Sequence, residues 1–517
     1  MGAQVTAQDG WTVARLQGTP YEIGFQNGYL LAQGSDYYME TYVFGLNNGP
    51  GSVTRLKDEE IAAEHIWPVI PSEYQQELQG IADGMAAAGY PQDNLWDVVA
   101  ANAWSELSIY GRLPVTAPVP PIPASPSHLR KFLPAIPEAV QTQVDAADVA
   151  EPSKGGCSAF IATGADWTTD GLPVMGHDTW SSWDSQFMYN VMFYVHPRSG
   201  YDFAYQSCGG SIWSGQDWYE NSAGLMLAET TLSDRASNPY GVPIFVRARE
   251  AIQYCATVDQ AVFGRPVNGV MYGFQAGTSA SNGGYCNEWL IGDATGRIAS
   301  LQLGTLAYDL SETTNGFYGS CNYTWGPHII YESAHARSGA VPYNPNGTPN
   351  GTGVGVPSTP SARWVRWGQI KAQYQGLGAI DAQVAQQFQM DTYDTQYGLA
   401  NHPDKNTLCG EPSIPWPALP AHDDFPAYPG VTAAQTSDSG AYDGKVTTES
   451  MVLNGLQMYA RWGYPTGDSF FGEPYPQNVL DYEAAHLTLS DVYKFGLDAL
   501  CSITPVPWTL MTDPYED

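Results

Sequence analysis

The chain has 517 residues, and its 21 basic and 53 acidic side chains give a formal net charge of −32 at pH 7. A surface this acidic repels phosphate backbones and anionic lipid headgroups, which argues against nucleic-acid binding and electrostatic membrane binding. Hydrophobic residues make up 43% of the chain and aromatic residues 13%, which excludes a disordered protein and allows one large domain or roughly two to three smaller ones.

Signals for targeting and for disulfides are sparse. No apolar run reaches the roughly 18 residues of a membrane span, so we expect no transmembrane segment. The N-terminal stretch MGAQVTAQDGWTVARLQG lacks the basic and apolar regions of a signal peptide. The chain has seven cysteines but no Cys-x-x-Cys pair, which argues against structural zinc and leaves six cysteines for up to three disulfides of undetermined pairing.

Residues 1–112 are expected to mix strands and helices. Residues 11–18 (WTVARLQG) predict a strand. Helical periodicity then predicts three helices, within 18–34, 73–89 and 93–107, the last with Asn94 or Asp93 as its N-cap.

Residues 113–156 have a different composition. Eight prolines between Pro114 and Pro137 preclude a continuous helix or a central strand there. A proline-rich stretch of this kind is typical of a linker between domains. The alternative, a pro-segment that ends at a cleavage site, depends on the motif that follows.

From residue 157 onward the sequence is dominated by short apolar or alternating runs, which predict strands separated by Gly, Asp and Asn turns. These strands are expected within 157–167, 172–180, 187–195, 224–231, 288–293, 298–304 and 446–463. Helices are expected within 242–262 and 361–375, and residues 343–360 have the composition of a loop. No fixed-period repeat is evident, which argues against solenoids and propellers.

The motif Gly155-Gly156-Cys157 is the most informative point in the sequence. A thiol is the best side-chain nucleophile near neutral pH, and two glycines permit the unusual backbone geometry that attack on the preceding carbonyl requires. Hydrolysis of the resulting thioester at Gly156–Cys157 would leave Cys157 as a new N-terminus, whose α-amine could act as the base for its own thiol. The alternative is a buried cysteine at the start of a core strand.

Several segments occur in the order found in a known family: GTPYEIGFQNGYLLA, ELQGIADGMAAAG, CSAFIATG, GHDTWSSWDSQFMYNVMFYV, SCGGSIWSGQDWYENSAGLMLAETTL, GSCNYTWGP and TPSARWVRW. With these segments the sequence resembles the phospholipase B-like proteins and the related isopenicillin-N acyltransferase family, which are N-terminal-nucleophile (Ntn) hydrolases. The resemblance implies an α+β fold, the Ntn-hydrolase αββα four-layer sandwich with two antiparallel sheets. It also implies that Cys157 is the nucleophile.

The resemblance assigns His177 and Asp178 to a neighbouring strand, and their spacing of about 20 residues from the nucleophile suits a hairpin. His177 is expected to hydrogen-bond the thiol or the new α-amine, although a core histidine is the alternative. Asp178 occupies a position where the family more often has Asn. Its expected role, to orient the neighbouring catalytic groups by polar contacts, is therefore less secure.

Asn322 matches the family asparagine that donates its amide to the developing oxyanion. Two other readings stay open for it, a turn residue and a glycosylation acceptor in Asn-Tyr-Thr. Arg363 matches a family arginine near the nucleophile, and an arginine on a helix surface is the alternative. Thr230, Thr231 and Trp180 are expected to contact the substrate, with core packing as the alternative for the tryptophan.

The function implied is a self-cleaving cysteine Ntn hydrolase that cleaves or transfers an acyl group at a linear amide bond through a cysteinyl thioester. Residues 1–156 would form a light chain and residues 157–517 a heavy chain, which stay associated. We expect a small acyl-amide or lipid as substrate, and no metal or cofactor. A phospholipase B-type esterase and a non-catalytic carbohydrate- or lipid-binding protein stay open as alternatives. The expected location is outside the cytosol, either secreted or in a periplasmic or lysosome-like compartment, with the cytoplasm left open.

Overall fold

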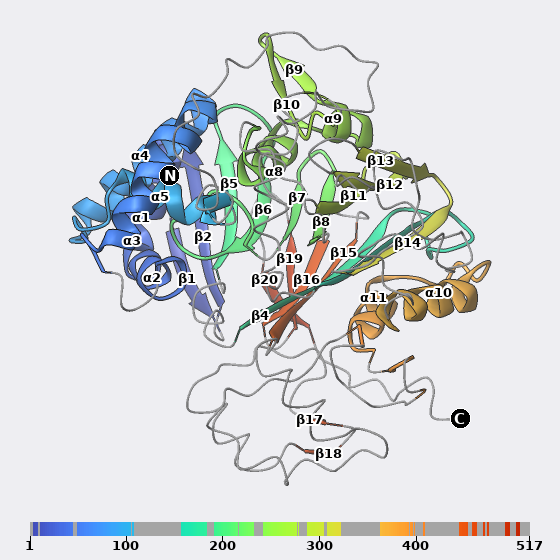
Figure 1. Ribbon diagram of the computed structural model, residues 1–517. Helices are drawn as coiled ribbons and strands as arrows, with labels where there is room; N and C mark the ends of the chain where they lie inside the picture. The colour runs from blue at the N-terminus through green and yellow to red at the C-terminus, as the bar shows by residue number, and fades with distance from the viewer. Residues whose placement is uncertain are drawn as a thin grey trace, which may run out of the picture.

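Two β-sheets pack face to face in the computed structural model of the chain, and helices cover the outer face of each sheet (Figure 1). The structure describes residues 4–8, 11–44, 49–104, 106–107, 157–182, 191–215, 217–231, 241–276, 278, 287–303, 308–321, 362–391, 393–395, 398, 407–408, 444–452, 457–462, 469–470, 473–474, 492–496 and 503–506. The proline-rich segment and the expected loop at 343–360 lie outside these residues, so the predictions for them stay predictions.

The first sheet has nine strands in the order β1-β2-β5-β6-β7-β8-β11-β12-β13. Their bounds are β1 Gln4–Gln8, β2 Trp11–Gly18, β5 Val191–Pro197, β6 Phe203–Ser207, β7 Trp218–Asn221, β8 Met226–Thr231, β11 Asn287–Gly292, β12 Ile298–Leu303 and β13 Tyr308–Thr313. Strand β2 runs parallel to β5, and the other pairings of this sheet are antiparallel. The N-terminal segment is thereby built into the same sheet as the rest of the chain.

The second sheet has seven strands in the order β14-β3-β4-β15-β16-β19-β20. Their bounds are β3 Ser158–Thr163, β4 Val174–Ser182, β14 Gly316–Cys321, β15 Gly444–Val452, β16 Gln457–Trp462, β19 Val492–Gly496 and β20 Ile503–Val506. Two small ribbons pair β9 (Arg265–Val267) with β10 (Val270–Tyr272) and β17 (Ser469–Phe470) with β18 (Glu473–Pro474).

Helices form the two outer layers. The layer on the nine-stranded sheet contains α1 Pro20–Leu30, α2 Ala32–Tyr38, η1 Met39–Val43, α3 Val53–Ile61, η2 Ala62–Ile66, η3 Trp67–Val69, α4 Ser72–Ala87, α5 Leu95–Asn102, α8 Ile244–Tyr254 and α9 Val258–Phe263. The layer on the seven-stranded sheet contains α10 Ala362–Tyr374 and α11 Ala382–Gln389, drawn in orange in Figure 1. The order helix, sheet, sheet, helix confirms the expected αββα sandwich, with one parallel pair in an otherwise antiparallel architecture.

The local signals in the sequence agree with most of these elements. Thr19 and Glu22 form a capping box at the start of α1, and Asn94 with Asp97 forms another at the start of α5. The helix expected within 242–262 is interrupted, because Cys255 adopts an extended backbone and Thr257 caps a second helix. None of the helices in the described part of the chain is long and apolar enough to cross a bilayer.

Two of the seven cysteines take no part in disulfides. Cys208 Sγ lies 2.9 Å from Ser211 Oγ, and Cys255 Sγ lies 3.2 Å from the Gln260 carbonyl oxygen, so both are buried thiols. Burial raises the pKa of Cys208 to about 12, which makes it a poor nucleophile. The expected maximum of three disulfides is therefore too high.

Helices α1 and α4 are in direct backbone contact through two glycines on each helix. A Cβ at Gly28 would lie 2.0 Å from the Ile81 carbonyl oxygen, and a Cβ at Gly84 would lie 2.4 Å from the Phe25 carbonyl oxygen. No real Cβ contact is that short, so only glycine allows this separation of the helices. Gly24 and Gly80 are equally close to the opposite helix.

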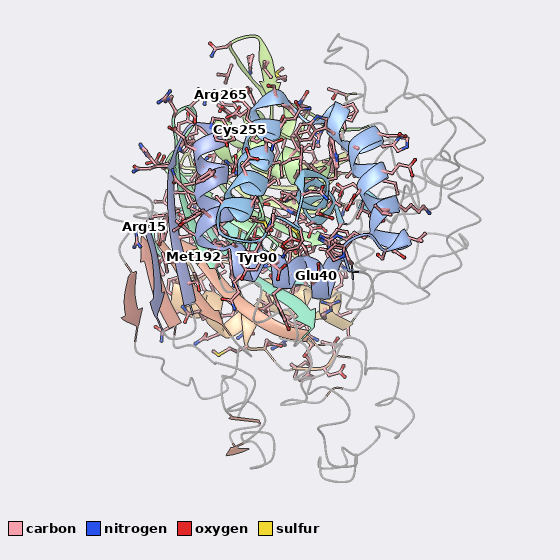
Figure 2. All side chains as sticks on the ribbon, turned by 90° about the vertical axis from the view of Figure 1, so that its left-hand side faces the viewer. Arg15, Glu40, Tyr90, Met192, Cys255 and Arg265 are labelled. Atoms are coloured by element: carbon pink, nitrogen blue, oxygen red, sulfur yellow. The ribbon has the colours of Figure 1, made fainter. Side chains whose placement is uncertain are left out.

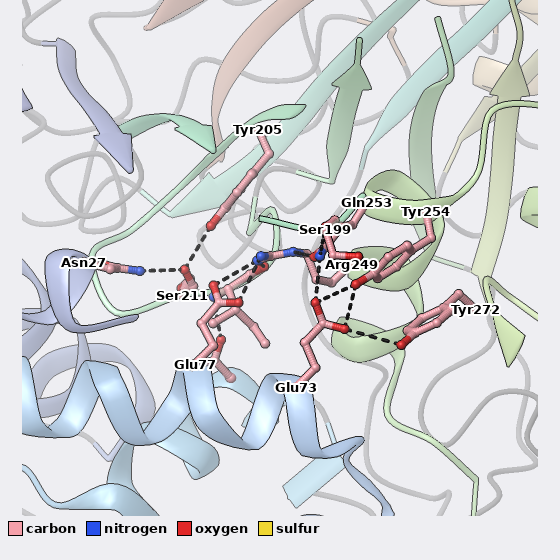
Figure 3. Close-up of polar contacts among 12 residues, drawn as sticks. Asn27, Glu73, Glu77, Ser199, Tyr205, Ser211, Arg249, Gln253, Tyr254 and Tyr272 are labelled. Carbon is pink, nitrogen blue, oxygen red and sulfur yellow. Dashed lines mark hydrogen bonds and ion pairs between the residues drawn. The ribbon is translucent and has the colours of Figure 1, made fainter. Parts of the chain in front are cut away.

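A buried ion pair connects α4 to α8 (Figure 3). Arg249 Nη1 and Nη2 donate to Glu77 Oε1 and Oε2 at 3.0 and 2.9 Å, and both side chains are at most 2% exposed. Arg249 Nη1 also donates to the Ile212 carbonyl at 2.8 Å. Such a pair adds little net stability when intact, but the loss of one partner leaves an uncompensated buried charge.

Two asparagines of the N-terminal helices bind the backbone of the loop between β6 and β7. Asn27 Nδ2 donates to the Ser211 carbonyl at 3.0 Å, and its Oδ1 accepts from Gly210 N at 3.0 Å. Asn102 donates to the Gly210 carbonyl at 3.0 Å and accepts from Ile212 N at 2.9 Å. The N-terminal helices thus satisfy the buried polar backbone of this loop.

We expect Gly28→Ala to destabilise the protein, because its Cβ would overlap the α4 backbone, by about 2 kcal/mol or more. Gly34→Ala in α2 is the matched control, since nothing lies within 4 Å of its Cβ position. This control should be neutral or stabilising by up to about 1 kcal/mol. Urea unfolding followed by circular dichroism compares the variants, and equal effects would contradict the close helix contact.

Removal of either partner of the buried pair, with Arg249→Met or Glu77→Gln, should lower the free energy of unfolding by about 3–5 kcal/mol. The double variant should lose less than the sum of the two single losses, because no unpaired charge remains buried. Arg297→Gln is the control, since it breaks partly exposed pairs with Asp259 and Glu312 and should cost under about 1 kcal/mol. Strict additivity in the double variant would contradict the coupling.

Candidate active site

Cys157 lies at the entrance to β3, where three strands of the seven-stranded sheet meet. It is 4% exposed, and the next residue, Ser158, is opposite Cys321 of β14 on one side and Asp178 of β4 on the other. Ala159 is opposite His177. The hairpin expected from the spacing is therefore present and places His177 and Asp178 beside the start of β3.

Asp217 faces the thiol from the opposite sheet. Its Oδ2 is 3.9 Å from Cys157 Sγ, and its backbone has a left-handed φ of 65°. The backbone N–H of Glu229 donates to the Asp217 carbonyl at 2.8 Å, which fixes the end of the loop against β8. Burial, together with the nearby Glu229 carboxyl, holds the pKa of Asp217 well above its ordinary value.

Asp217 is a site residue that was not expected from the sequence. Its signal was the Gly-Gln-Asp-Trp-Tyr segment, which carried part of the family resemblance but was not read residue by residue. The contact with Cys157 joins residues 60 positions apart, in two different sheets. Only the packing of the sheets brings them together.

His177 is completely buried and lies next to the thiol. Its Nε2 is 3.0 Å from the Glu229 carbonyl oxygen, and its Nδ1 is 3.2 Å from Thr179 Oγ1. Because a carbonyl oxygen only accepts, Nε2 carries the proton and Nδ1 accepts from the threonine hydroxyl. Burial lowers the pKa of His177 to about 4, so the ring is neutral near pH 7.

Arg363 extends from the first turn of α10 to the backbone at Cys157. Its Nη1 donates to the Cys157 carbonyl at 2.8 Å and contacts Ser158 Oγ at 3.3 Å. The side chain is 6% exposed, which rules out the alternative of an arginine on the helix surface. Arg363 thus fixes the main chain that carries the thiol.

Thr230 belongs to a chain of hydrogen bonds between the two sheets. Its hydroxyl pairs with the Ser320 hydroxyl, which donates to Glu288 Oε2 at 2.8 Å. Trp367 Nε1 donates to the Ser320 carbonyl at 2.9 Å, which connects α10 to β14. This network fixes the end of β14 next to β3.

Thr231 and Asn287 hydrogen-bond the Glu229 carboxyl on the other face of β8. Burial raises the pKa of Glu229 to about 8, although these two hydrogen bonds oppose the shift. The Glu229 carboxyl in turn disfavours ionisation of Asp217, and the Glu288 carboxyl disfavours ionisation of Glu229.

Four predicted residues are placed only in part or not at all. Asp178 is buried in β4 at the position opposite Ser158. Trp180 lies in β4 by its backbone, opposite Val446, and its side chain is outside the described part. Gly156 and Asn322 lie outside the described residues, although the neighbour of Asn322, Cys321, ends β14 opposite Ser158.

One ligand atom from each of Cys157, His177 and Asp217 lies within 4.8 Å of the other two, a donor set of the type that binds zinc. The expectation of no metal stays a prediction. A cavity of about 430 Å³ lies elsewhere, between α4 and α8, and its lining includes Glu73 and Tyr254 but no member of the Cys157 group.

Comparisons with known proteins give distant likenesses. No protein-family model matches the chain. An uncharacterised protein of Archaeoglobus fulgidus is 24% identical over 274 residues, which make up 49% of this chain and 38% of that protein. The chain thus matches about two fifths of the length of this relative.

Two of the similar solved structures are a variant of the conjugated bile acid hydrolase from Clostridium perfringens and the penicillin V acylase from Agrobacterium tumefaciens. The hydrolase is 12% identical to this chain, and the alignment covers 68% of this chain and 97% of the hydrolase. The acylase is 13% identical, and the alignment covers 68% of this chain and 98% of the acylase. The TM-scores are 0.30 and 0.26, which do not establish a shared fold. The layering described above rests on the strand pairing and the helix packing.

The low pKa of His177 makes the stability of the fold depend on pH. Between pH 6.5 and about 4 the unfolded chain binds the histidine proton and the folded chain does not, so stability falls as the pH decreases through this window. In the wild type, this histidine should lower the free energy of unfolding by up to about 3 kcal/mol across the window. We expect that decrease to be absent in His177→Gln.

The control for that experiment is His196→Gln, which changes an exposed histidine paired with Asp202. This variant should keep the wild-type slope of unfolding free energy against pH, measured by urea unfolding at several pH values. A His177→Gln slope equal to that of the wild type would contradict the buried neutral imidazole.

Proposed function

We propose that this protein is a cysteine Ntn hydrolase or acyltransferase that acts on a linear amide bond, with Cys157 as its nucleophile. The observation that carries the proposal is the position of the Cys157 thiol. It lies at the start of a core strand, 3.9 Å from the half-buried carboxyl of Asp217, with its own carbonyl held by Arg363. A merely structural cysteine has no need of a carboxyl and a buried guanidinium at the same residue.

The proposed activation begins with attack of the Cys157 thiolate on the carbonyl carbon of Gly156. The new C–S bond forms as the Gly156–Cys157 C–N bond breaks, and the departing nitrogen takes a proton to become the α-amine of Cys157. Water then hydrolyses the thioester, which leaves a carboxylate on Gly156 and regenerates the thiol. Arg363 supports this step because it holds the Cys157 main chain while the peptide on its other side is broken.

In turnover, the α-amine accepts the thiol proton, and the sulfur attacks the amide carbonyl of the substrate. The amine leaves with that proton, and the acyl group stays on sulfur as a thioester. Water or an acceptor amine then takes the acyl group. An unperturbed α-amine has a pKa of about 8, which suits a base that works near neutral pH.

The carboxyl of Asp217 has a specific part in this scheme. Before cleavage no cation has been created beside it, and burial with the nearby Glu229 carboxyl raises its pKa. Cleavage creates an ammonium group on the residue that Asp217 already faces, and a nearby positive charge lowers a carboxyl pKa. We therefore assign Asp217 as the partner that orients the α-amine, with His177 and Asp178 as neighbouring polar groups.

The substrate would enter between the two sheets. Thr230 lies on the face of β8 toward the other sheet, and we assign it to substrate contact together with Trp180. Thr231 hydrogen-bonds Glu229 on the other face of β8, so its assignment to substrate contact rests on the sequence alone. Asn322 follows the strand end opposite Ser158 and is assigned as the oxyanion donor. A small N-acyl amino acid or lipoamide fits this chemistry, and the reaction needs no metal or cofactor.

The light chain (1–156) and heavy chain (157–517) would stay together after cleavage. Strand β2 pairs with β5 along seven residues, Arg249 binds Glu77, and Asn102 binds the loop at Gly210. These contacts join the two sides of the proposed cut through buried groups. Secretion, or export to an acidic compartment, remains part of the proposal.

Purified wild type should give two fragments on denaturing electrophoresis, and the larger should have the intact mass of residues 157–517. Cys157→Ala should remain one chain and should hydrolyse N-acyl amino acids at least about 10³-fold more slowly. Cys255→Ala is the matched control, because it removes another buried thiol and should leave both cleavage and activity unchanged.

An uncleaved wild type after incubation at low pH would contradict self-activation. Cleaved protein that acts on phospholipid esters but not on amides would replace the amidase with the phospholipase B-type esterase. Cleaved protein that is inactive on both substrate classes would favour the binding protein.

A further inference from the structure

Three acidic side chains converge in the N-terminal helical layer, far along the chain from Cys157. Asp36 lies in α2, Glu40 in η1, and Asp93 in the turn before α5. One carboxylate oxygen from each lies within 4.8 Å of the other two. Glu40 and Tyr90 are labelled in Figure 2, and the Tyr90 carbonyl accepts from the backbone N–H of Asp93.

Arg55 already neutralises one side of this group. Its Nη2 contacts Asp93 Oδ1 at 2.9 Å, its Nε contacts Asp97 Oδ1 at 2.7 Å, and its Nη1 pairs with Glu40. The guanidinium is fully buried, and all of its nitrogens lie against carboxylates. It therefore cannot turn to serve the opposite side of Asp93.

The other oxygen of Asp93 is left without a partner. Asp93 is 1% exposed, and its Oδ2 makes no hydrogen bond within the part of the chain that the structure describes. A buried carboxylate oxygen with no donor is costly, and each such atom in a folded protein needs an explanation. This observation is independent of the clustering of the acids, and it indicates a missing positive group.

The charge balance leads to the same conclusion. Four carboxyl groups lie within 4.0 Å of the guanidinium of Arg55, and a fifth lies beside Glu40 and Asp93, so five acidic groups share one cation. They belong to Asp36, Glu40, Glu59, Asp93 and Asp97. A divalent cation would offset part of the negative charge of this group and supply the positive charge that Asp93 Oδ2 lacks.

We propose that Asp36, Glu40 and Asp93 bind a divalent cation of the oxygen-preferring class, for which calcium is the probe. Calcium binds carboxylate oxygens at about 2.3–2.6 Å, so two of its ligands can lie up to about 5 Å apart. The separation of at most 4.8 Å among the three oxygens fits that range. Gln92 Nε2 donates to Asp36 Oδ1 at 2.9 Å and orients that carboxylate.

The bound ion would stabilise the helices that hold the β6–β7 loop. Asp93 directly precedes the N-cap of α5, and α5 carries Asn102, which binds the loop backbone at Gly210 and Ile212. A cation at the start of α5 would thus secure the same helix that supports the Asp217 side of the catalytic centre. The inference about the ion itself does not depend on the proposed function.

A proton shared between Asp93 and Asp36 is the rival explanation. Burial raises the pKa of Asp93 to about 7, and a hydrogen bond between the Asp93 and Asp36 carboxyls adds to the shift, while Arg55 opposes it. A shared proton would satisfy Oδ2 without any metal. The two explanations differ in their response to calcium.

The test measures thermal unfolding and titration calorimetry of chelator-treated full-length protein with calcium chloride, at constant ionic strength. The wild type should bind about one calcium per chain, and its Tm should rise by about 3 °C or more at saturation. Asp36→Asn should lose the saturable binding and the Tm rise. Glu59→Gln is the matched control, because it removes a carboxylate that lies 4.0 Å from Arg55 but is not one of the three proposed ligands. This variant should bind calcium and gain stability from it as the wild type does.

Three results would overturn the proposal. The first is a wild type that binds no calcium or magnesium, which would leave the shared proton. The second is an equal response in Asp36→Asn, which would indicate diffuse binding to an acidic surface. The third is saturable binding of zinc alone. If Asp36→Asn does not fold, Glu40→Gln replaces it as the test variant. The calorimetry of the wild type alone still shows whether one calcium binds per chain.

Discussion

The candidate active site depends on how the loop between β6 and β7 is held. Asn27 and Asn102 from the N-terminal helices, and Arg249 from α8, bind the backbone of residues 210–212. The same loop ends at Asp217, the carboxyl that faces the thiol. Because Arg249 is itself fixed by Glu77 of α4, the N-terminal segment is part of the scaffold of the site. A chain cut at Gly156–Cys157 would therefore need its N-terminal piece to remain bound, which the buried polar contacts and the β2–β5 pairing would ensure.

Burial gives the ionisable groups of the site an unusual charge state. Burial lowers the pKa of His177 to about 4 and raises the pKa of Glu229 to about 8. It also raises the pKa of Asp217. Before cleavage His177 and Glu229 are therefore mainly neutral near pH 7, and ionisation of Asp217 is disfavoured. In the proposed mechanism the first charge to appear among them is the ammonium of Cys157. The structure thus favours a site that becomes polar only when its own nucleophile is released.

Much of the local structure could be read from the sequence, because it depends on local signals. The capping residues Thr19 and Asn94 identify helix starts, and the spacing of His177 from Cys157 identifies the β3–β4 hairpin. The pairing of β2 with β5 is different, since an alternating pattern predicts a strand but not its partner. Asp217 was missed for a similar reason, because its contact joins two sheets through a loop with a left-handed residue. Arg363 was predicted near the nucleophile, but its bond to the backbone carbonyl depends on how α10 packs on β14.

The most direct test of the account is the identity of the covalent intermediate. Protein incubated with an N-acyl amino acid, quenched in acid and digested, should show the acyl mass on the peptide that begins with Cys157. The adduct should be lost with hydroxylamine, as expected for a thioester, and the α-amine of that peptide should be unmodified. An acyl group on any other residue, or turnover of the amide with no adduct at Cys157 under rapid quenching, would contradict the central claim.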